Sequence, residues 1–213
     1  MTGLRARQKA DRHQRILQAA SELFRKSGYE GAKIEAIAAM AEVSIGTIYN
    51  YYQNKGDLLV AIVAMEVNEV LNAGRKVIDN PPGNVAKAVD RLVISYIEHS
   101  LVYLSKEMWR QAMAISTQQP ESPFGKTYSG LDRALTDQTC ILIGRLQKLG
   151  HIREDIDARS VGEMIFNNTN MMFALFVKSE DMTIAELRAA IRRQNRLLLE
   201  AAASNATSPN IGQ

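Results

Sequence analysis

Apolar residues recur at intervals of three and four along nearly the whole chain, and this spacing constrains the fold more than any other feature. Ile16, Leu17, Ala20, Leu23 and Phe24 form one such stripe near the start. A helical period of 3.6 places residues at these intervals on one face, whereas a half-buried strand alternates with a period of two. Because Val/Ile alternation is missing, the sequence predicts an all-α protein.

Breaks in the pattern divide the chain into about nine helices. Pro81-Pro82-Gly83 and the segment from Gln119 to Pro123 interrupt it, and Gly150 ends a long helix. Asp157 is suited to cap the next helix, and Thr183 with Glu186 forms a capping box for the last. The expected helices span about residues 8–27, 34–41, 45–51, 55–78, 84–104, 105–118, 124–149, 157–179 and 183–202.

Composition excludes several classes of protein. Hydrophobic residues make up 46% of the 213, but no apolar stretch approaches the roughly 18–20 residues of a membrane helix. The single cysteine, Cys140, excludes an internal disulfide framework and a Cys-rich zinc site, and we interpret it as a packed thiol. The basic N-terminus lacks the apolar region of a secretory signal. We therefore expect a cytoplasmic protein with no membrane partner.

Positive charge is concentrated in the first quarter of the chain. Residues 1–56 hold nine Lys/Arg against five Asp/Glu, whereas residues 57–213 hold 17 against 18. A basic segment on an otherwise neutral body indicates an anionic partner, either nucleic acid or a membrane surface. Residues 5–15 lack the bulky apolar anchors that membrane binding requires. A solvated basic tail remains an alternative on charge alone.

Residues 34–57 predict a helix-turn-helix. Two short helices flank Glu42-Val43-Ser44, and the first offers a packing face that includes Ile37 and Ala41. The second packs through Ile48 and Tyr52, which leaves its polar residues on another face. This geometry places a second helix in the major groove of DNA.

The polar residues of the second helix have the chemistry of base and phosphate contacts. Ser44 is suited to cap its N-terminus. Asn50 can contact adenine with two hydrogen bonds, and Thr47 can contact a thymine methyl or a base edge. Tyr49 and Tyr51 carry hydroxyls that suit phosphate oxygens.

Lys55 is the first residue of the fourth predicted helix. The positive end of the helix dipole disfavours a cation there by some tenths of a kcal/mol. A lysine at this position is explained if a phosphate binds beside it, held by backbone amides and the ammonium group. A solvated lysine is the alternative.

This segment resembles the N-terminal DNA-binding domain of the tetracycline-repressor (TetR) family over about residues 12–60. The residues that carry the resemblance are Arg15-Ile16-Leu17, Ala19-Ala20, Leu23-Phe24, Gly28-Tyr29, Ile37-Ala38, Val43-Ser44, Gly46-Thr47, Tyr49, Tyr51-Tyr52, Lys55 and Leu58. The resemblance implies an all-helical homodimer that binds a palindromic double-stranded DNA operator as a repressor and is released by a small ligand. It also implies DNA contacts from the recognition helix, with Lys55 as phosphate anchor. The full predicted set is Lys33, Ser44, Gly46, Thr47, Tyr49, Asn50, Tyr51 and Lys55.

Three positions depart from the family pattern. Glu42 stands where glycine is common, and a positive φ there would cost on the order of 1 kcal/mol. Lys33 replaces a common threonine before the second helix, where it caps poorly but can reach a phosphate. Tyr52 replaces a common phenylalanine, a small change within the core.

The remaining residues offer polar groups on apolar helix faces. Asn168 has methionines and Ile165 at helical spacing, so its amide needs a partner: a ligand, a water, a symmetry mate or a polar residue of the bundle. Tyr96, His99 and Tyr103 form one predicted stripe. Because apolar walls with a few polar groups are typical of ligand cavities, we predict an effector site. Its predicted lining is Tyr96, His99, Tyr103, Trp109, Met113, Asn168 and Met172.

These patterns predict a DNA-binding domain of residues 1–56, a ligand-binding and dimerisation domain of residues 57–203, and a disordered tail of residues 204–213. We expect a homodimer through the last two helices, on faces that include Ile165, Phe166, Met172, Phe176, Ile191 and Leu198. A bundle that binds a partner protein instead of a metabolite is the alternative. The sequence has no catalytic motif, so we expect no enzyme activity, cofactor or metal.

Overall fold

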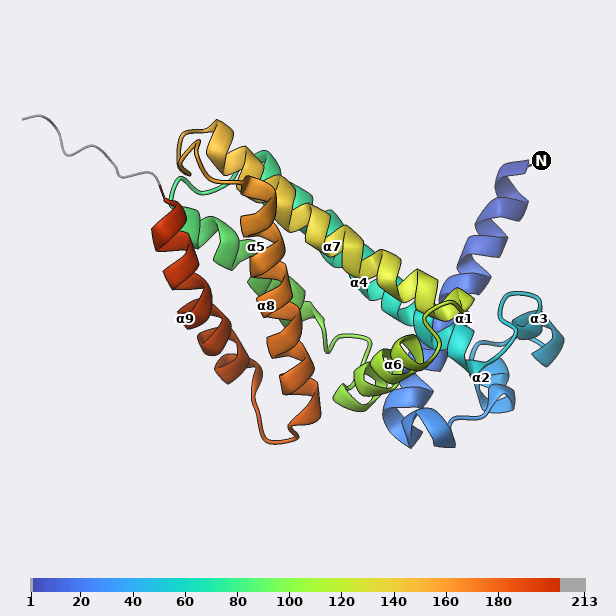
Figure 1. The fold of residues 1–213 in the computed structure, drawn as a ribbon. Helices are drawn as coiled ribbons and strands as arrows, with labels where there is room; N and C mark the ends of the chain where they lie inside the picture. Colours follow the sequence, from blue (N-terminus) through green and yellow to red (C-terminus); the bar gives the residue numbers. More distant parts are fainter. Residues whose placement is uncertain (1, 204–213) are drawn as a thin grey trace, which may run out of the picture. The chain divides into compact units, whose positions relative to one another are not determined.

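The computed structural model describes residues 2–203, so the predicted disordered tail lies outside the described residues. Over that range the chain forms nine α-helices and no strand (Figure 1), which confirms the predicted all-α fold class. The helices are α1 (Thr2–Gly31), α2 (Ile34–Met40), α3 (Ile45–Tyr49), α4 (Lys55–Asp79), α5 (Val85–His99), α6 (Lys106–Gln118), α7 (Pro123–Lys148), α8 (Ala158–Lys178) and α9 (Ile184–Ala202).

Several helix ends follow the local signals. The hydroxyl of Thr183 accepts the Glu186 N–H at 3.2 Å, and the Glu186 carboxylate accepts the Thr183 N–H at 2.8 Å, which confirms the capping box. Asp157 accepts the Ser160 N–H at 3.2 Å at the start of α8. Gly28 has φ 73° and ψ 163°, so the helical path of α1 is broken where the sequence predicted its end.

Two helix boundaries differ from the prediction by five residues or more. The helix α1 begins at Thr2 instead of residue 8, because residues 2–7 carry no apolar stripe and periodicity cannot reveal a helical turn without one. The helix α5 ends at His99 instead of residue 104. Trp109 Nε1 donates to the Ser100 carbonyl at 2.6 Å, so this carbonyl is satisfied by a tertiary contact beyond the helix end. The predicted single stripe is therefore wrong for Tyr103, which lies outside the helix of Tyr96.

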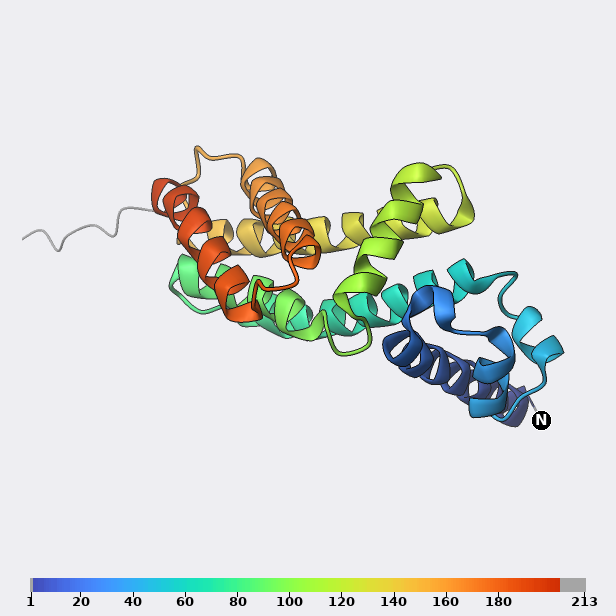
Figure 2. The same cartoon turned by 90° about the horizontal axis from the view of Figure 1, so that it is seen from below.

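The chain divides into two compact units, which we call unit 1 and unit 2. Unit 1 contains residues 1–69, 99–132 and 177–180. Within it, α1 packs against α2 and α6, and α2 packs against α3 (Figure 2). Its largest fully buried side chains come from α1 to α4 and from residues 104–108: Phe24, Ile16, Ile37, Ile48, Leu58, Leu59, Ile62, Leu104 and Met108. This core holds α2 and α3 against α1.

Among the described residues, unit 2 contains 70–98, 133–176 and 181–203. The helices α8 and α9 lie side by side in both views (Figures 1 and 2). A Cβ added to Gly162 of α8 would lie 2.6 Å from the Cys140 Cα of α7, so these backbones approach closely. The Cys140 thiol donates to the Arg159 carbonyl at 3.5 Å, and burial raises its pKa. These contacts agree with a packed thiol.

Four of the six residues predicted for the dimer face are buried, whereas Met172 and Leu198 are partly exposed. Ile165, Phe166, Phe176 and Ile191 are each at most 6% exposed and belong to the core of their own unit. An apolar helix face turns first toward the nearest core of its own chain, and the sequence pattern cannot separate that face from an intersubunit one. The exposed large apolar side chains of α8 and α9 are Met164, Met171, Leu175 and Leu197.

No helix within residues 2–203 is both long enough and apolar enough to cross a bilayer. The same residues contain no group of three or more His, Cys, Asp or Glu side chains arranged to hold a metal ion.

Candidate nucleic-acid interface

The turn between α2 and α3 is held from α1. Glu42 has φ 53°, the left-handed conformation anticipated at this position. Arg15 Nη1 donates to the Ala41 carbonyl at 2.8 Å and lies 3.5 Å from the Glu42 carboxylate. The side chain of Arg15 therefore stabilises the turn at Ala41 and at the strained residue itself.

The N-terminus of α3 is capped as predicted. Ser44 has an extended backbone, and its Oγ accepts the Thr47 N–H at 3.1 Å. The two side-chain hydroxyls of Ser44 and Thr47 lie 2.8 Å apart in a second hydrogen bond. Because capping satisfies a backbone donor that α3 cannot satisfy itself, this helix has a fixed start despite its five residues.

The two faces of α3 differ in exposure. Ile48 is fully buried and Tyr52, just beyond the helix, is 6% exposed, so both pack as predicted. On the opposite side, Tyr49 is 53% exposed and Asn50 is exposed. A Cβ at Gly46 would meet only the Ser44 Oγ, at 3.9 Å, so the backbone there is open to a close approach. This arrangement leaves a polar helix face free for a groove.

Tyr51 belongs to an aromatic cluster that the sequence did not predict. The His13 ring lies 5.9 Å from the Tyr51 ring and 5.8 Å from the Tyr52 ring, measured between centroids. Burial, with a smaller contribution from Lys9, lowers the pKa of His13. The Tyr51 hydroxyl donates to the Lys9 carbonyl at 3.5 Å. Its position beyond α3 is therefore set by α1, a tertiary relation that local spacing does not show.

The two predicted phosphate-binding lysines have different surroundings. Lys33 is exposed at the N-cap of α2 and makes no side-chain cap hydrogen bond, as anticipated. Lys55 is the first residue of α4, and its Nζ donates to the Glu30 carbonyl at 3.0 Å. The same ammonium lies 3.8 Å from the Glu30 carboxylate and 4.7 Å from the centre of the Tyr29 ring. Lys55 is thus held in place within unit 1, whereas Lys33 is free to reach outward.

Four predicted ligand residues lie in unit 1, where two of them join an acidic pair from α4. His99 Nδ1 lies 2.6 Å from Glu66 Oε1, and His99 Nε2 lies 3.2 Å from Glu69 Oε2. The Tyr103 hydroxyl donates to the Glu69 carboxylate at 3.0 Å. The Glu66 side chain is 2% exposed, and this burial raises its pKa to about 6 against the opposing effect of His99. We call these four residues the His99 cluster.

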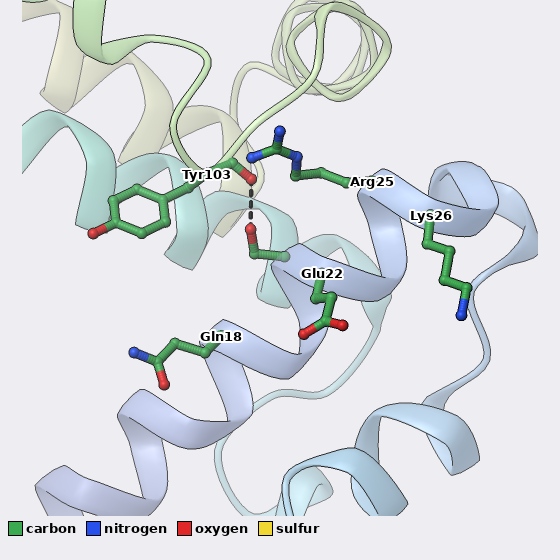
Figure 3. A pocket seen from close by; sticks show the side chains of 6 residues that line it. Gln18, Glu22, Arg25, Lys26 and Tyr103 are labelled. Carbon is green, nitrogen blue, oxygen red and sulfur yellow. Dashed lines mark hydrogen bonds between the residues drawn. The ribbon is translucent and has the colours of Figure 1, made fainter.

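The segment that carries Tyr103 also contacts α1. The hydroxyl of Ser21 donates to the Tyr103 carbonyl at 2.5 Å, and Arg25 Nη1 donates to the Val102 carbonyl at 2.5 Å. Figure 3 shows the first bond beside Arg25, at a surface pocket of about 430 Å³. The residues 102–103 therefore link the His99 cluster to α1 of the helix-turn-helix, within unit 1.

The other two ligand candidates of unit 1 are on α6. Trp109 is 6% exposed and donates to the Ser100 carbonyl. Met113 is partly exposed, and its carbonyl accepts the hydroxyls of Ser116 and Thr117 at 2.9 and 2.8 Å.

The remaining three candidates lie in unit 2. The Tyr96 hydroxyl donates to Gln138 Oε1 at 2.7 Å. Asn168 Nδ2 donates to Asn195 Oδ1 at 2.9 Å, so its partner is a polar residue of the same chain, one of the alternatives that the sequence left open. Met172 is partly exposed. Neither these contacts nor those of unit 1 test ligand binding, which stays a prediction.

Comparison with known proteins identifies the N-terminal segment. Residues 16–62 match the family described as "Bacterial regulatory proteins, tetR family". Over 91 residues the chain is 35% identical to the HTH-type transcriptional repressor KstR of Rhodococcus jostii, covering 43% of this chain and 41% of that protein. The chain thus spans about two fifths of the length of that relative in the alignment. It is also 27% identical over 181 residues to the fatty acid metabolism regulator protein of Bacillus subtilis, covering 82% and 88%.

Solved structures share the fold over most of the chain. A TetR-family transcriptional regulator from Pectobacterium atrosepticum superposes with a TM-score of 0.70 at 18% identity, covering 94% of this chain and 98% of that one. The transcriptional regulator FadR from Bacillus subtilis, solved in complex with stearoyl-CoA, gives a TM-score of 0.63 at 18% identity, covering 85% and 96%. At 18% sequence identity, these superpositions show a shared fold and nothing about function.

Proposed function

Because the chain belongs to the TetR family of bacterial regulatory proteins, we propose that it is a cytoplasmic transcriptional repressor that binds a palindromic operator and is released by a small-molecule effector. The observation that carries the proposal is the exposed polar face of α3, with a capped N-terminus and a packed opposite face. A helix presented in this way suits the major groove.

The proposed DNA contacts divide into two kinds. Asn50 and Thr47 read base edges, since an amide can pair with adenine through two hydrogen bonds. Lys33, Lys55, Tyr49 and Tyr51 contact phosphates, which fixes the register of α3 and supplies the salt-dependent part of the affinity. Ser44 and Gly46 support this interface through the cap and through close backbone approach.

A dimer is needed to read two half-sites. Met164, Met171 and Leu175 fall on one stripe of α8, and each is 48–63% exposed. Leu197 of α9 is 68% exposed. We propose that these side chains, instead of the buried ones named from sequence, form an isologous interface between copies. Half-sites one helical turn apart, roughly 34–36 Å, would match such a dimer.

The effector class is suggested by a relative. The Bacillus subtilis protein that aligns over 82% of this chain is named a fatty acid metabolism regulator, and the FadR structure from that organism holds stearoyl-CoA. A fatty acyl-CoA is therefore the first effector to test. The seven ligand candidates remain to be tested one at a time by substitution.

The test is a binding titration on DNA that flanks the chain's own gene, because such regulators are expected to act on neighbouring genes. The full chain should bind one palindromic segment, sediment as a dimer at micromolar concentration, and release the DNA when an acyl-CoA is added. A monomer, or equal binding to a scrambled duplex of the same length, would overturn the operator proposal.

If the DNA binds but no acyl-CoA or other metabolite releases it, the alternative gains support. In that case the helices beyond the DNA-binding domain would bind a partner protein. The relatives named here are regulators, so we propose no enzyme activity.

A further inference from the structure

A groove of about 200 Å³ runs between α5 and α9 in unit 2. Its floor is apolar and buried, with every floor residue at most 4% exposed: Val89, Val93, Ile191 and Leu199. Asp90, Arg192 and Arg196 also line it, together with Asn195. An apolar floor with a few polar groups at one side is the usual composition of a small-molecule site.

Arginines at intervals of four line one side of α9, and two of them pair with acids of α5. Arg188 Nη1 lies 2.5 Å from Glu98 Oε1. Arg192 donates twice to the Asp90 carboxylate, at 2.6 and 3.1 Å. These pairs show that α5 and α9 run antiparallel, so the next arginine in the series meets the N-terminal end of α5.

That third arginine has no acid across the groove. Arg196 and Ala86 both line the groove, and Ala86 lies in the first turn of α5. The described partner of Arg196 is Glu200 on its own helix, at 3.7 Å. A carboxylate opposite Arg196 would complete the series, and the positive end of the α5 dipole would favour it further.

Asn195 provides a second donor in the same groove. Its side chain is 5% exposed, and its Oδ1 accepts from Asn168. Within residues 2–203 its amide nitrogen donates no hydrogen bond, yet this atom is not fully buried, so it can be reached from the groove. The nitrogen is therefore available to an acceptor atom in the groove.

We propose that this groove binds a short-chain carboxylate. The carboxylate accepts hydrogen bonds from Arg196 and Asn195, and the alkyl chain lies on the floor formed by Val89, Val93, Ile191 and Leu199. The groove volume of about 200 Å³ corresponds to about seven groups of the size of a water molecule, at roughly 30 Å³ each. A six-carbon carboxylic acid has a chain of about this size. This site is additional to the effector proposed above and does not depend on it.

The test is calorimetric titration of sodium hexanoate into the full chain without DNA. We expect a dissociation constant of about 1 mM or below. Hexan-1-ol should bind at least about tenfold more weakly, because it lacks the anionic acceptor that pairs with a guanidinium. Arg196→Gln should weaken hexanoate binding by about tenfold or more. The matched control is Arg193→Gln, which removes an exposed arginine of α9 outside the groove and should leave the affinity unchanged.

A second variant supplies the missing acid. Ala86 is exposed, so Ala86→Asp should fold, pair with Arg196 and abolish hexanoate binding. The proposal is overturned if hexanoate fails to bind, if hexan-1-ol binds equally well, if the two arginine variants behave alike, or if Ala86→Asp leaves binding unchanged. Since DNA is absent from these titrations, their failure leaves the operator proposal intact, and failure of operator binding leaves this site intact.

Discussion

The exposed face of α3 and the His99 cluster both carry polar side chains, yet their polar groups are satisfied differently. Tyr49 and Asn50 make no side-chain hydrogen bond within the described residues. In the His99 cluster both ring nitrogens face carboxylates, and Glu66 is nearly inaccessible. A polar group in water loses little when it lacks a protein partner, whereas a buried group that loses its partner is costly, and Glu66 Oε2 already lies buried without a hydrogen bond among the described residues. Substitutions on α3 should therefore change recognition, and substitutions in the cluster should change stability.

The largest effect is expected from His99→Ala. The substitution removes the hydrogen bond between the imidazole and a buried carboxylate, and leaving a buried charged group without its partner costs about 3 kcal/mol of unfolding free energy. Denaturant unfolding at pH 8, above the raised pKa of Glu66, would measure it. His151→Ala is the control, because that histidine is partly exposed and outside the cluster, and should change stability by less than about 0.5 kcal/mol. If the two variants lost the same unfolding free energy, the His99 cluster would contribute no more to stability than a surface histidine.

Asn50→Ala should change recognition without changing stability. It removes a proposed contact to one adenine, so discrimination at one base position should fall by about 1–3 kcal/mol. The unfolding free energy should stay within about 0.5 kcal/mol, because the side chain is exposed. Binding to a set of single-base operator variants measures the first quantity. Asn80→Ala, at an exposed asparagine just beyond α4, is the control and should leave the base preference unchanged.

The raised pKa of Glu66 predicts that the stability of the folded chain depends on pH. Its pKa is raised from 4.5 to about 6, so the folded state holds the proton more tightly than the unfolded chain does. The stabilising contribution is therefore fully present below pH 4.5 and is lost as pH rises through about 6. The difference amounts to about 2 kcal/mol. Comparing wild type with Glu66→Gln between pH 4.5 and 7.5 isolates this group, and parallel stability curves for the two proteins would contradict it.

Local signals in the sequence predicted the parts of the interface that depend on neighbours along the chain. Ser44 caps α3 by accepting from the Thr47 N–H three residues on, Glu42 takes a positive φ, and Ile48 and Tyr52 are buried. The approximate number of helices and the capping box at Thr183 followed in the same way.

The sequence did not predict contacts between segments that lie far apart along the chain. The sequence contains Glu66 and Glu69 at helical spacing, but nothing local shows that they face His99, some 30 residues later. The end of α5 was misplaced because Leu101, Val102 and Leu104 continue the apolar spacing, whereas the carbonyls of Val102 and Tyr103 accept hydrogen bonds from α1. The prediction failed for four of the six residues of the dimer face, which are buried in their own chain, because an apolar face does not indicate whether its partner is its own chain or another.

The smallest expected effects are those of substituting Lys33 and Lys55, and they distinguish the roles of the two lysines. Lys33→Ala and Lys55→Ala should each weaken binding to all operator sequences alike, and each should reduce the slope of log affinity against log salt by about 0.9 per lost phosphate contact. Lys33 is exposed and makes no cap bond, so its loss should leave stability unchanged. Lys55 donates to the Glu30 carbonyl and lies over the Tyr29 ring, so its loss should also cost about 1–2 kcal/mol of unfolding free energy. Salt titrations of binding, paired with denaturant unfolding of each variant, measure both quantities. A stability loss in Lys55→Ala with an unchanged salt slope would make Lys55 a structural lysine and leave the phosphate contact to Lys33.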